Sequence, residues 1–364
     1  MTENATYETL RSRPSYRDIE LYAPNRTPAT IDLSDNTNRW GVPPAALREL
    51  RRASETSMSR YPDLYGASLK RALAAYVGVE PGMIVTGCGS DDVLDSAIRA
   101  FAEPGELIAT PDPSFPMIPL FARMNGLECA RVSLDPSYSV DAESLIALDP
   151  SVIYLCSPNN PTGTTIPRST IECLLARARG VVIVDEAYVE FSDGSIVDLI
   201  ERSSKLLVVR TMSKAFGLAG LRVGYAVGDP ALVAEVEKSR GPYKLSAIAE
   251  RAAIAALTED LGWVRECVAL TVANREALTA ELAARAIDAV PSSSNFVFAP
   301  IANASAIATR MRELGVAVRA FDHLRATSAA LERTGGSALR ISVGPWREIL
   351  PTLAALDEAR TGCA

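Results

Sequence analysis

The sequence predicts an α/β protein with a large domain, whose mostly parallel sheet is flanked by helices, and a smaller C-terminal α/β domain. Short, near-continuous apolar runs are typical of strands that are covered on both faces. Helical segments separate these runs, and such alternation favours a parallel sheet. The strands are expected at residues 83–88, 107–110, 152–156, 181–184, 206–209 and 223–227.

The helices of the large domain are predicted from apolar spacing and from their end signals. Residues 44–55 place Leu47 and Leu50 on one face and arginines on the others, and residues 68–77 repeat the helical period. A Gly-Cys-Gly-Ser segment leads into a helix over 91–102, and Asn125-Gly126 ends a helix over 115–124.

The pattern changes after about residue 245. Two long helical segments, 246–256 and 263–285, precede the strand-like segments 295–299, 316–321 and 339–343, with further helices over 304–314 and 347–360. A chain of 364 residues is long for one hydrophobic core and sufficient for two domains. We therefore expect a large domain over 44–245 and a small domain formed by 1–43 and 246–364.

Composition excludes several classes of function. The net charge of −7 disfavours a nucleic-acid partner. The polar N-terminus and the absence of a long apolar run predict a cytoplasmic protein without a signal peptide or membrane span. Six scattered cysteines lack C-x-x-C spacing and are expected as free thiols. A single histidine, His323, excludes a two-histidine metal site, so the chemistry is expected from a lysine, a carboxylate or a cofactor.

Two polar motifs follow predicted strands, where ligands bind on such sheets. The segment 87–91 places Ser90 and Asp91 at the start of a helix, where free N–H groups bind phosphate; the alternative is an ordinary capped helix. The segment S-P-N-N-P-T-G at 157–163 forms a rigid turn that presents the Asn160 amide, or a plain turn.

Two further motifs carry ionisable groups. Asp185 ends a buried strand, where a carboxylate needs a partner such as a protonated pyridine nitrogen, and Tyr188 follows it; an N-cap or a metal ligand is the alternative. Lys214 lies in a tight loop after another strand, where loss of solvation favours the neutral amine. A solvated loop lysine is the alternative. Thr211, Ser213 and Arg222 supply donors for a phosphate.

Together these motifs resemble the fold-type-I aminotransferases that use pyridoxal 5'-phosphate (PLP), and within them the histidinol-phosphate aminotransferase group. The resemblance covers nearly the whole chain. It runs from L-S-D-N at 33–36 and R-Y-P at 60–62 through D-E-A-Y-V-E-F at 185–191 and T-M-S-K-A-F-G-L-A-G-L-R-V-G at 211–224 to L-R-I-S-V-G at 339–344.

The resemblance implies a role for each matching residue. Lys214 holds PLP as a Schiff base and is the catalytic residue. Asp185 pairs with the pyridine nitrogen, Tyr188 and Asn160 hold the ring oxygen, and Phe115 stacks on the ring. Ser90, Asp91, Thr211, Ser213 and Arg222 hold the phosphate, with Tyr61 from the neighbouring subunit of a homodimer. Arg340, Asn36, Tyr22 and Arg319 contact the substrate.

The implied reaction is ping-pong amino transfer between an amino acid and a 2-oxo acid or a histidinol-phosphate-type substrate. The group usually carries a glutamate where this chain has Thr37, which leaves the acceptor open. A specialised 2-oxo acid of a secondary pathway, with a guanidino group as one case given Asp35, is an alternative. A PLP-dependent decarboxylase or lyase is a second alternative. A third is a PLP-binding sensor domain of a transcriptional regulator, which would need an added DNA-binding domain; the 40 or so residues before the first helix are too few for one.

Overall fold

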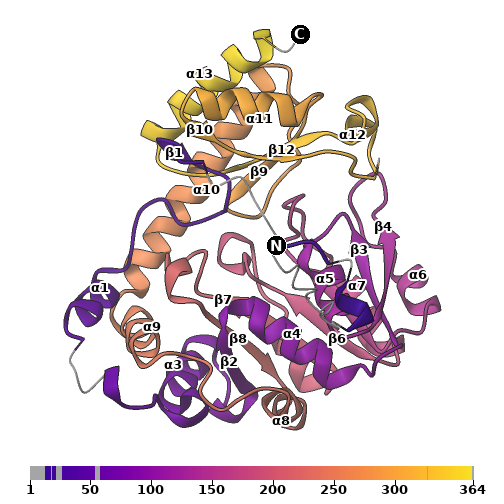
Figure 1. Cartoon of the computed structure of the whole chain (residues 1–364), viewed down its shortest axis with the longest axis vertical. Coiled ribbons are helices and arrows are strands. Elements are labelled where there is room, and N and C mark those ends of the chain that lie inside the picture. Colours follow the sequence, from indigo (N-terminus) through magenta and orange to yellow (C-terminus); the bar gives the residue numbers. More distant parts are fainter. Residues whose placement is uncertain (1–12, 18, 22–26, 54–57, 326, 363–364) are drawn as a thin grey trace, which may run out of the picture.

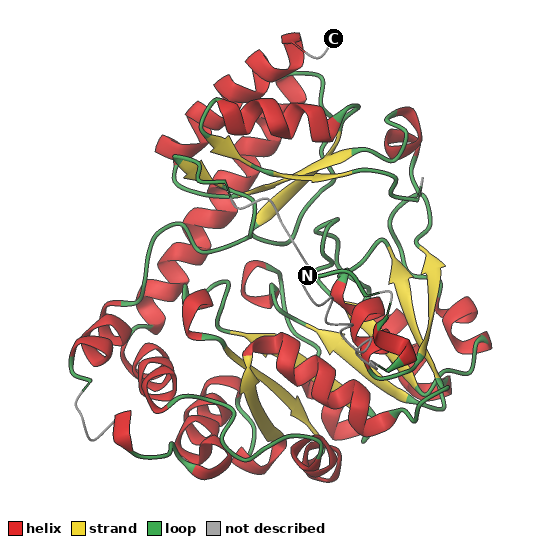
Figure 2. Ribbon diagram, in the orientation of Figure 1, coloured by secondary structure: helices red, strands yellow, loops and turns green. Residues whose placement is uncertain are grey.

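A large sheet and a smaller three-stranded sheet form the two units of the molecule, and a long helix, α10 (Leu261–Ala284), runs between them (Figure 1). The computed structural model describes residues 13–17, 19–21, 27–53, 58–325 and 327–362. Helices cover both sheets, with loops gathered where the two sheets face each other (Figure 2). The predicted α/β class, a mostly parallel large sheet with a smaller C-terminal unit, is confirmed.

The large sheet has seven strands in the order β2-β8-β7-β6-β5-β3-β4. Its five strands from β7 to β4 run parallel, and β8 is antiparallel to both of its neighbours. The strands are β2 (Ile84–Cys88), β3 (Leu107–Asp112), β4 (Glu128–Ser133), β5 (Val152–Cys156), β6 (Val181–Asp185), β7 (Leu206–Thr211) and β8 (Val223–Gly228).

Alternate residues of the central strands enter two different cores. On β5, Ile153 and Leu155 pack in the core that contains Val184 of β6, whereas Tyr154 packs on the opposite face with Ile183. This period of two follows from the pleat of a strand. It places the side chains of consecutive residues at each strand end on opposite sides of the sheet.

The edge strand β4 was not predicted. Its sequence, Glu-Cys-Ala-Arg-Val-Ser, leaves most of its side chains exposed or half-buried, because only one neighbour and one partly covered face constrain it. A strand of this kind lacks the continuous apolar run that identified the buried strands.

Helices and 3-10 turns complete the large unit. The helices are α1 (Pro44–Arg51), α3 (Ala67–Val77), α4 (Gly89–Phe101), α5 (Met117–Met124), α6 (Ala142–Ala147), α7 (Arg168–Arg177), α8 (Pro230–Lys238) and α9 (Ala247–Glu259). The 3-10 turns are η1 (Pro14–Tyr16), η2 (Leu64–Gly66), η3 (Pro81–Met83), η4 (Val189–Phe191), η5 (Val197–Arg202) and η6 (Ala219–Leu221), of which η1 lies beside α5.

The small unit contains a three-stranded antiparallel sheet in the order β11-β12-β9. A parallel pair joins β1 to β10 beside it, so the single strand expected over 316–321 is divided between two sheets. The elements are β1 (Ile31–Asp32), β9 (Phe296–Pro300), β10 (Val316–Ala317), β11 (Arg319–Phe321), β12 (Ala338–Ser342), α11 (Ala304–Glu313), α12 (Ala329–Arg333) and α13 (Trp346–Gly362).

The division into two domains stays a proposal, and we place it after α9 rather than at residue 245. Helix α9 packs against α1 and α3, and its alanines lie in the same core as β6 and β7. A helix that buries its apolar face in the large core belongs to that unit. Among the described residues, no helix is long and apolar enough to cross a membrane.

Candidate active site

A pocket of about 290 Å³ opens at the carboxyl ends of β5, β6 and β7, where the large sheet faces the small one. It brings together thirteen of the residues predicted for the site. They are Asn36, Ser90, Asp91, Phe115, Asn160, Asp185, Tyr188, Thr211, Ser213, Lys214, Arg222, Arg319 and Arg340. Asp35, Met117, Cys156 and Phe321 also line it, and Thr37 does not.

Lys214 lies on the loop after β7, with its amine turned into the pocket. The Nζ atom donates a hydrogen bond to the carbonyl oxygen of Asp35 at 3.1 Å and lies 5.8 Å from the centre of the Tyr188 ring. Burial, with a further contribution from the Arg340 charge, lowers the pKa of Lys214 to about 8. About a tenth of this amine is therefore neutral, and hence nucleophilic, at pH 7, far more than for an exposed lysine.

Asp185 ends β6 and is almost fully buried at 4% exposure. Its Oδ2 accepts a hydrogen bond from the Tyr154 hydroxyl at 2.8 Å, and its Oδ1 accepts one from the Ala187 N–H at 3.0 Å. Burial raises the pKa of Asp185 to about 6, against the lowering effect of these two hydrogen bonds. The carboxylate is thus ionised at neutral pH and faces a pocket that can take a cation.

The loops around Gly89 and Arg222 lie close together and form a cradle at one end of the pocket lining. Gly89 has φ +81°, and a Cβ there would collide with the Arg222 guanidinium. A Cβ on Gly224 would collide with the backbone of Gly89 and Ser90, so β8 and the start of α4 approach at backbone distance. The Thr211 hydroxyl donates to Ser213 Oγ at 3.0 Å, which groups two hydroxyls beside Arg222. Arginine, hydroxyls and a helix N-terminus are suited to a dianion.

The N-terminal segment and β12 complete the pocket from the small unit. Asn36 Nδ2 donates to the Tyr188 hydroxyl at 3.1 Å, and Ser342 Oγ donates to Asn36 Oδ1 at 3.1 Å. Arg340 donates to Asn160 Oδ1 at 2.6 Å and to the Ser34 carbonyl at 2.6 Å. Residues more than 150 positions apart in the sequence therefore hold one another at the mouth of the site.

Arg319 and Arg340 lie directly opposite each other on the neighbouring strands β11 and β12, and both line the pocket. The guanidinium carbon of Arg340 also lies 5.4 Å from the centre of the Phe296 ring and 5.8 Å from that of Phe321. The aromatic rings hold the guanidinium plane by cation–π contact. The result is a cationic wall opposite Lys214, suited to an anionic group on a substrate.

Residues 28–355 match the family model "Aminotransferase class I and II". The chain belongs to this family. Among its relatives is the histidinol-phosphate aminotransferase of Thermoanaerobacter pseudethanolicus, 33% identical over 93% of this chain and 95% of the relative. Histidinol-phosphate aminotransferase 1 of Pseudomonas aeruginosa is 36% identical over 86% of this chain and 91% of its own.

A solved structure has the same fold. Histidinol-phosphate aminotransferase from Sinorhizobium meliloti, in complex with pyridoxal-5'-phosphate, superimposes with a TM-score of 0.88 and 26% identity, covering 99% of this chain and 100% of that one. The resemblance read from the motifs is confirmed, and the protein is a PLP-dependent aminotransferase. The comparisons support amino transfer, and nothing in them favours a decarboxylase, a lyase or a sensor.

The aminotransferase pocket fits PLP by its own chemistry. It offers a partly desolvated amine for the aldehyde, a buried carboxylate for the ring nitrogen and a glycine-lined cradle for the phosphate. No group of three or more His, Cys, Asp or Glu side chains that could hold a metal ion was found in the described part of the chain.

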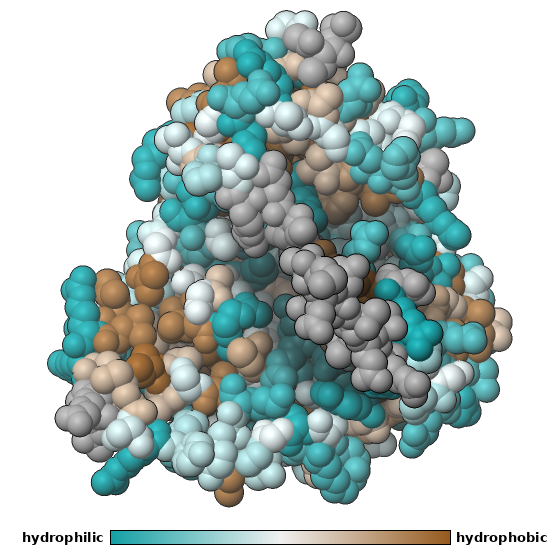
Figure 3. Space-filling model, in the orientation of Figure 1, coloured by the Kyte–Doolittle hydropathy of each residue, from teal (hydrophilic) through white to brown (hydrophobic). Residues whose placement is uncertain are grey.

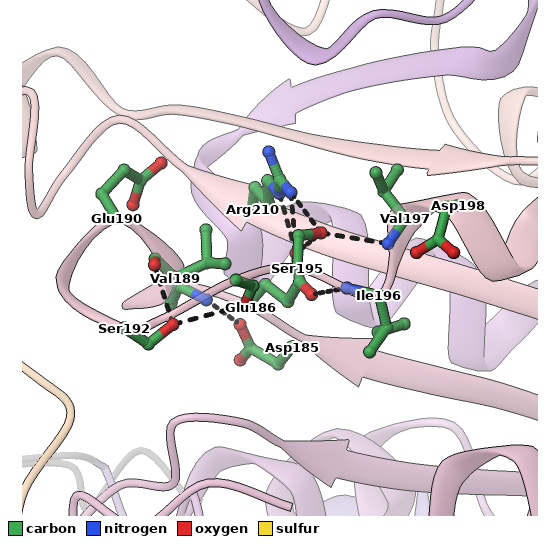
Figure 4. A network of polar contacts seen from close by, with 12 residues as sticks. Asp185, Glu186, Val189, Glu190, Ser192, Ser195, Ile196, Val197, Asp198 and Arg210 are labelled. Carbon is green, nitrogen blue, oxygen red and sulfur yellow. Dashed lines mark hydrogen bonds and ion pairs between the residues drawn. The ribbon is translucent and has the colours of Figure 1, made fainter. Parts of the chain in front are cut away.

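A buried polar network lies on the other face of the sheet of this aminotransferase (Figure 4). Glu186 Oε2 accepts from Arg210 Nε at 3.0 Å and from Ser195 Oγ at 2.8 Å, and Oε1 accepts from the Ile196 N–H at 2.9 Å. Arg210 Nη2 also donates to Ser195 Oγ at 2.6 Å. Glu186 follows Asp185 and Arg210 precedes Thr211, so this ion pair ties together the two strand ends that carry the pocket.

Tyr61 and Tyr22 are the two predicted site residues outside the set of thirteen that lines the pocket. Tyr61 is 82% exposed, stacks on Tyr243 with ring centres 4.7 Å apart, and does not line the pocket of its own chain. Figure 3 shows apolar atoms gathered over α1 and its neighbours. The exposed apolar residues include Val42, Leu47, Met58, Leu64 and Tyr65. Tyr22 lies outside the described residues.

Tyr154, Glu186 and Arg210 were missed as functional candidates, although the sequence carries a signal for Tyr154 and Arg210. A tyrosine inside Val-Ile-Tyr-Leu-Cys and an arginine inside Leu-Leu-Val-Val-Arg-Thr are polar groups in otherwise apolar strands. Buried hydroxyls and charges need partners. A polar residue in an apolar strand predicts that its side chain has a partner, but only the register between neighbouring strands shows which residue that partner is.

Proposed function

We propose that this aminotransferase uses Lys214 as its catalytic amine and that its substrates carry an anionic group bound by Arg340 and Arg319. Amino acids, 2-oxo acids and histidinol phosphate meet this requirement. The observation that carries the proposal is the placement of a neutral-prone lysine opposite two arginines in one pocket. The names of the relatives favour histidinol phosphate as the first substrate to test.

The residues of the pocket divide the work. Bound PLP supplies an electron sink for the bond at the substrate α-carbon. Lys214 would hold the cofactor and would move the proton at that carbon as a general base and acid. Asp185 would keep the ring nitrogen protonated, Phe115 would pack against the ring, and Tyr188 with Asn160 would orient its oxygen. Arg340 fixes the substrate by a bidentate contact that a lysine does not reproduce.

The phosphate is assigned to the cradle. Arg222 and the Thr211 and Ser213 hydroxyls supply donors, and Ser90 and Asp91 begin helix α4. Asp91 Oδ2 lies 3.5 Å from Arg222 Nη2 and orients that guanidinium. In this arrangement Asp91 acts through Arg222, because a carboxylate repels a phosphate directly.

The deciding experiment follows the visible absorbance band of the PLP-bound protein while amino donors are added one at a time. Glutamate or histidinol phosphate should replace the band with that of the pyridoxamine form, and Lys214→Ala should show no such exchange. Arg340→Lys should raise KM at least tenfold with a smaller change in kcat, as expected for loss of a bidentate contact. A stable band that no donor converts would refute the proposal.

We further propose that the enzyme is a homodimer in which Tyr61 reaches the cofactor phosphate of the partner subunit. The exposed Tyr61–Tyr243 stack and the apolar residues around it support this interface. Tyr61→Ala and Lys214→Ala should each be nearly inactive. Mixed subunits should regain about a quarter of wild-type activity, because each hybrid dimer contains one site with both residues. No recovery after verified subunit exchange would contradict a shared site.

A further inference from the structure

We propose that Tyr154 is a positioning residue that keeps Asp185 charged and aimed at the ring nitrogen of PLP. The inference rests on the role proposed for Asp185 and adds a residue that does not line the pocket. Tyr154 lies in the middle of β5, is fully buried, and donates its hydroxyl hydrogen to Asp185 Oδ2 at 2.8 Å.

The strand register brings the two side chains together. On the parallel strands β5 and β6, Tyr154 pairs with Ile183 and Cys156 pairs with Asp185. Tyr154 and Asp185 are thus diagonal neighbours on one face of the sheet, a separation that a long aromatic side chain bridges. The ring packs in the core of that face with Ile183 and Cys156. The Cys156 side chain is the other group that interacts with this hydroxyl, and it is a weaker acceptor than the carboxylate.

The hydrogen bonds fix the carboxyl group without neutralising it. Tyr154 and the Ala187 N–H each occupy one oxygen, and a carboxylate has about four acceptor positions. Both donors are uncharged, so the negative charge and the remaining acceptor positions are available to the pocket that Asp185 lines. Within the described part of the chain, no arginine or lysine forms an ion pair with Asp185.

The electrostatic direction agrees with this geometry. Burial raises the pKa of Asp185, and the Tyr154 hydrogen bond opposes that rise. Burial also raises the pKa of Tyr154 well above its usual value, so the hydroxyl remains a donor at working pH. Without this donor the shared proton moves from the ring nitrogen toward Asp185. The ring then carries less positive charge and is a weaker electron sink.

The test compares Tyr154→Phe with Tyr225→Phe. Tyr225 is also a fully buried tyrosine of this sheet, but it packs in the opposite core. In Tyr154→Phe, kcat should fall about 10- to 100-fold with little change in KM, the range expected for a hydrogen bond to a charged group. The pH midpoint of the visible band of bound PLP should rise. A positive ring repels a proton on the Lys214 nitrogen, so a less positive ring allows that nitrogen to keep its proton to higher pH.

A second replacement tests the sign and does not depend on the stability of Tyr154→Phe. Replacing Tyr154 with 3-fluorotyrosine keeps nearly the same volume and makes the hydroxyl a stronger donor, so the band midpoint should fall. Unchanged midpoints in both variants, or equal shifts in Tyr225→Phe, would overturn the inference. Asp185→Asn separates the two claims. If this variant leaves the visible band and kcat unaltered, the proposed role of Asp185 fails. If Asp185→Asn alters them and the Tyr154 variants do not, only the proposed role of Tyr154 fails.

Discussion

Asp185 and Glu186 are consecutive carboxylates at the end of one buried strand, yet their surroundings are opposite. Asp185 receives hydrogen bonds from a tyrosine hydroxyl and a backbone N–H. Glu186 contacts an arginine directly, with Arg210 Nη2 2.8 Å from its Oε2. The pleat of β6 sends one side chain to the pocket face and the other to the face where the Glu186–Arg210 network lies.

The difference explains what each carboxylate does. A charge whose partner is built into the fold is already compensated, so Glu186 has its cation in place and serves to join two strands. A charge that accepts hydrogen bonds only from neutral donors still favours a cation, which supports the proposal that Asp185 pairs with a protonated ring nitrogen. The same chemical group, a carboxylate, therefore joins two strands at Glu186, whereas at Asp185 we propose that it holds the ring nitrogen of the cofactor.

The largest effect should come from breaking the Glu186–Arg210 pair. The two side chains are 3% and 8% exposed, and removal of one partner from a buried pair costs about 3–5 kcal/mol. Arg210→Met should lower the free energy of unfolding by that amount, measured by urea denaturation of the PLP-free protein.

The double variant Arg210→Met with Glu186→Leu is the matched control. Because it removes the uncompensated carboxylate as well, it should recover most of the stability. If the double variant is as unstable as Arg210→Met, the loss comes from packing rather than from charge.

Asp185→Asn should show the reverse pattern, a large loss of activity without a loss of stability. Loss of one preorganised electrostatic partner reduces kcat by about 10²–10³-fold. The folded pKa of Asp185 lies above its usual value, so its stabilising contribution is complete below pH ~3.8 and is lost as the pH rises through about 6. The PLP-free Asp185→Asn protein should therefore be at least as stable as wild type at pH 8. A loss of stability similar to that of Arg210→Met would remove the contrast between the two residues.

The sequence was sufficient for the fold class and the four pocket motifs, because each motif is local and follows an apolar strand. Residue type and position also predicted Lys214 and Asp185 for the site, and both line the pocket, while their roles stay predictions. The sequence did not identify the Tyr154–Asp185 and Glu186–Arg210 contacts, since these depend on the register between neighbouring strands. The opposition of Arg319 and Arg340 likewise depends on pairing between β11 and β12.

A smaller effect is expected from Glu190, which adjoins the same network. Burial raises the pKa of Glu190 to about 7, and the nearby Arg210 charge opposes the rise. Because the folded pKa is raised, the stabilisation is complete below pH ~4.5 and is lost as the pH increases through about 7. The effect of Glu190→Gln on the free energy of unfolding should be more stabilising at pH 8 than at pH 5, by roughly 2–3 kcal/mol. Equal effects at both pH values would show that Glu190 is not protonated in the fold.

The smallest effect concerns the pocket face alone. Lys214 has a pKa of about 8, so capture of PLP by the cofactor-free protein should accelerate about tenfold per pH unit below 8 and level off above it. Burial is the main cause and the Arg340 charge adds to it, so Arg340→Gln should move the midpoint upward by less than about one unit. Rapid-mixing absorbance across pH 6–10 measures both curves.

Arg210→Met is the control, because it removes a charge from the opposite face of the sheet and should leave the midpoint in place. An equal shift in that variant would show that the two faces of the sheet are electrostatically coupled.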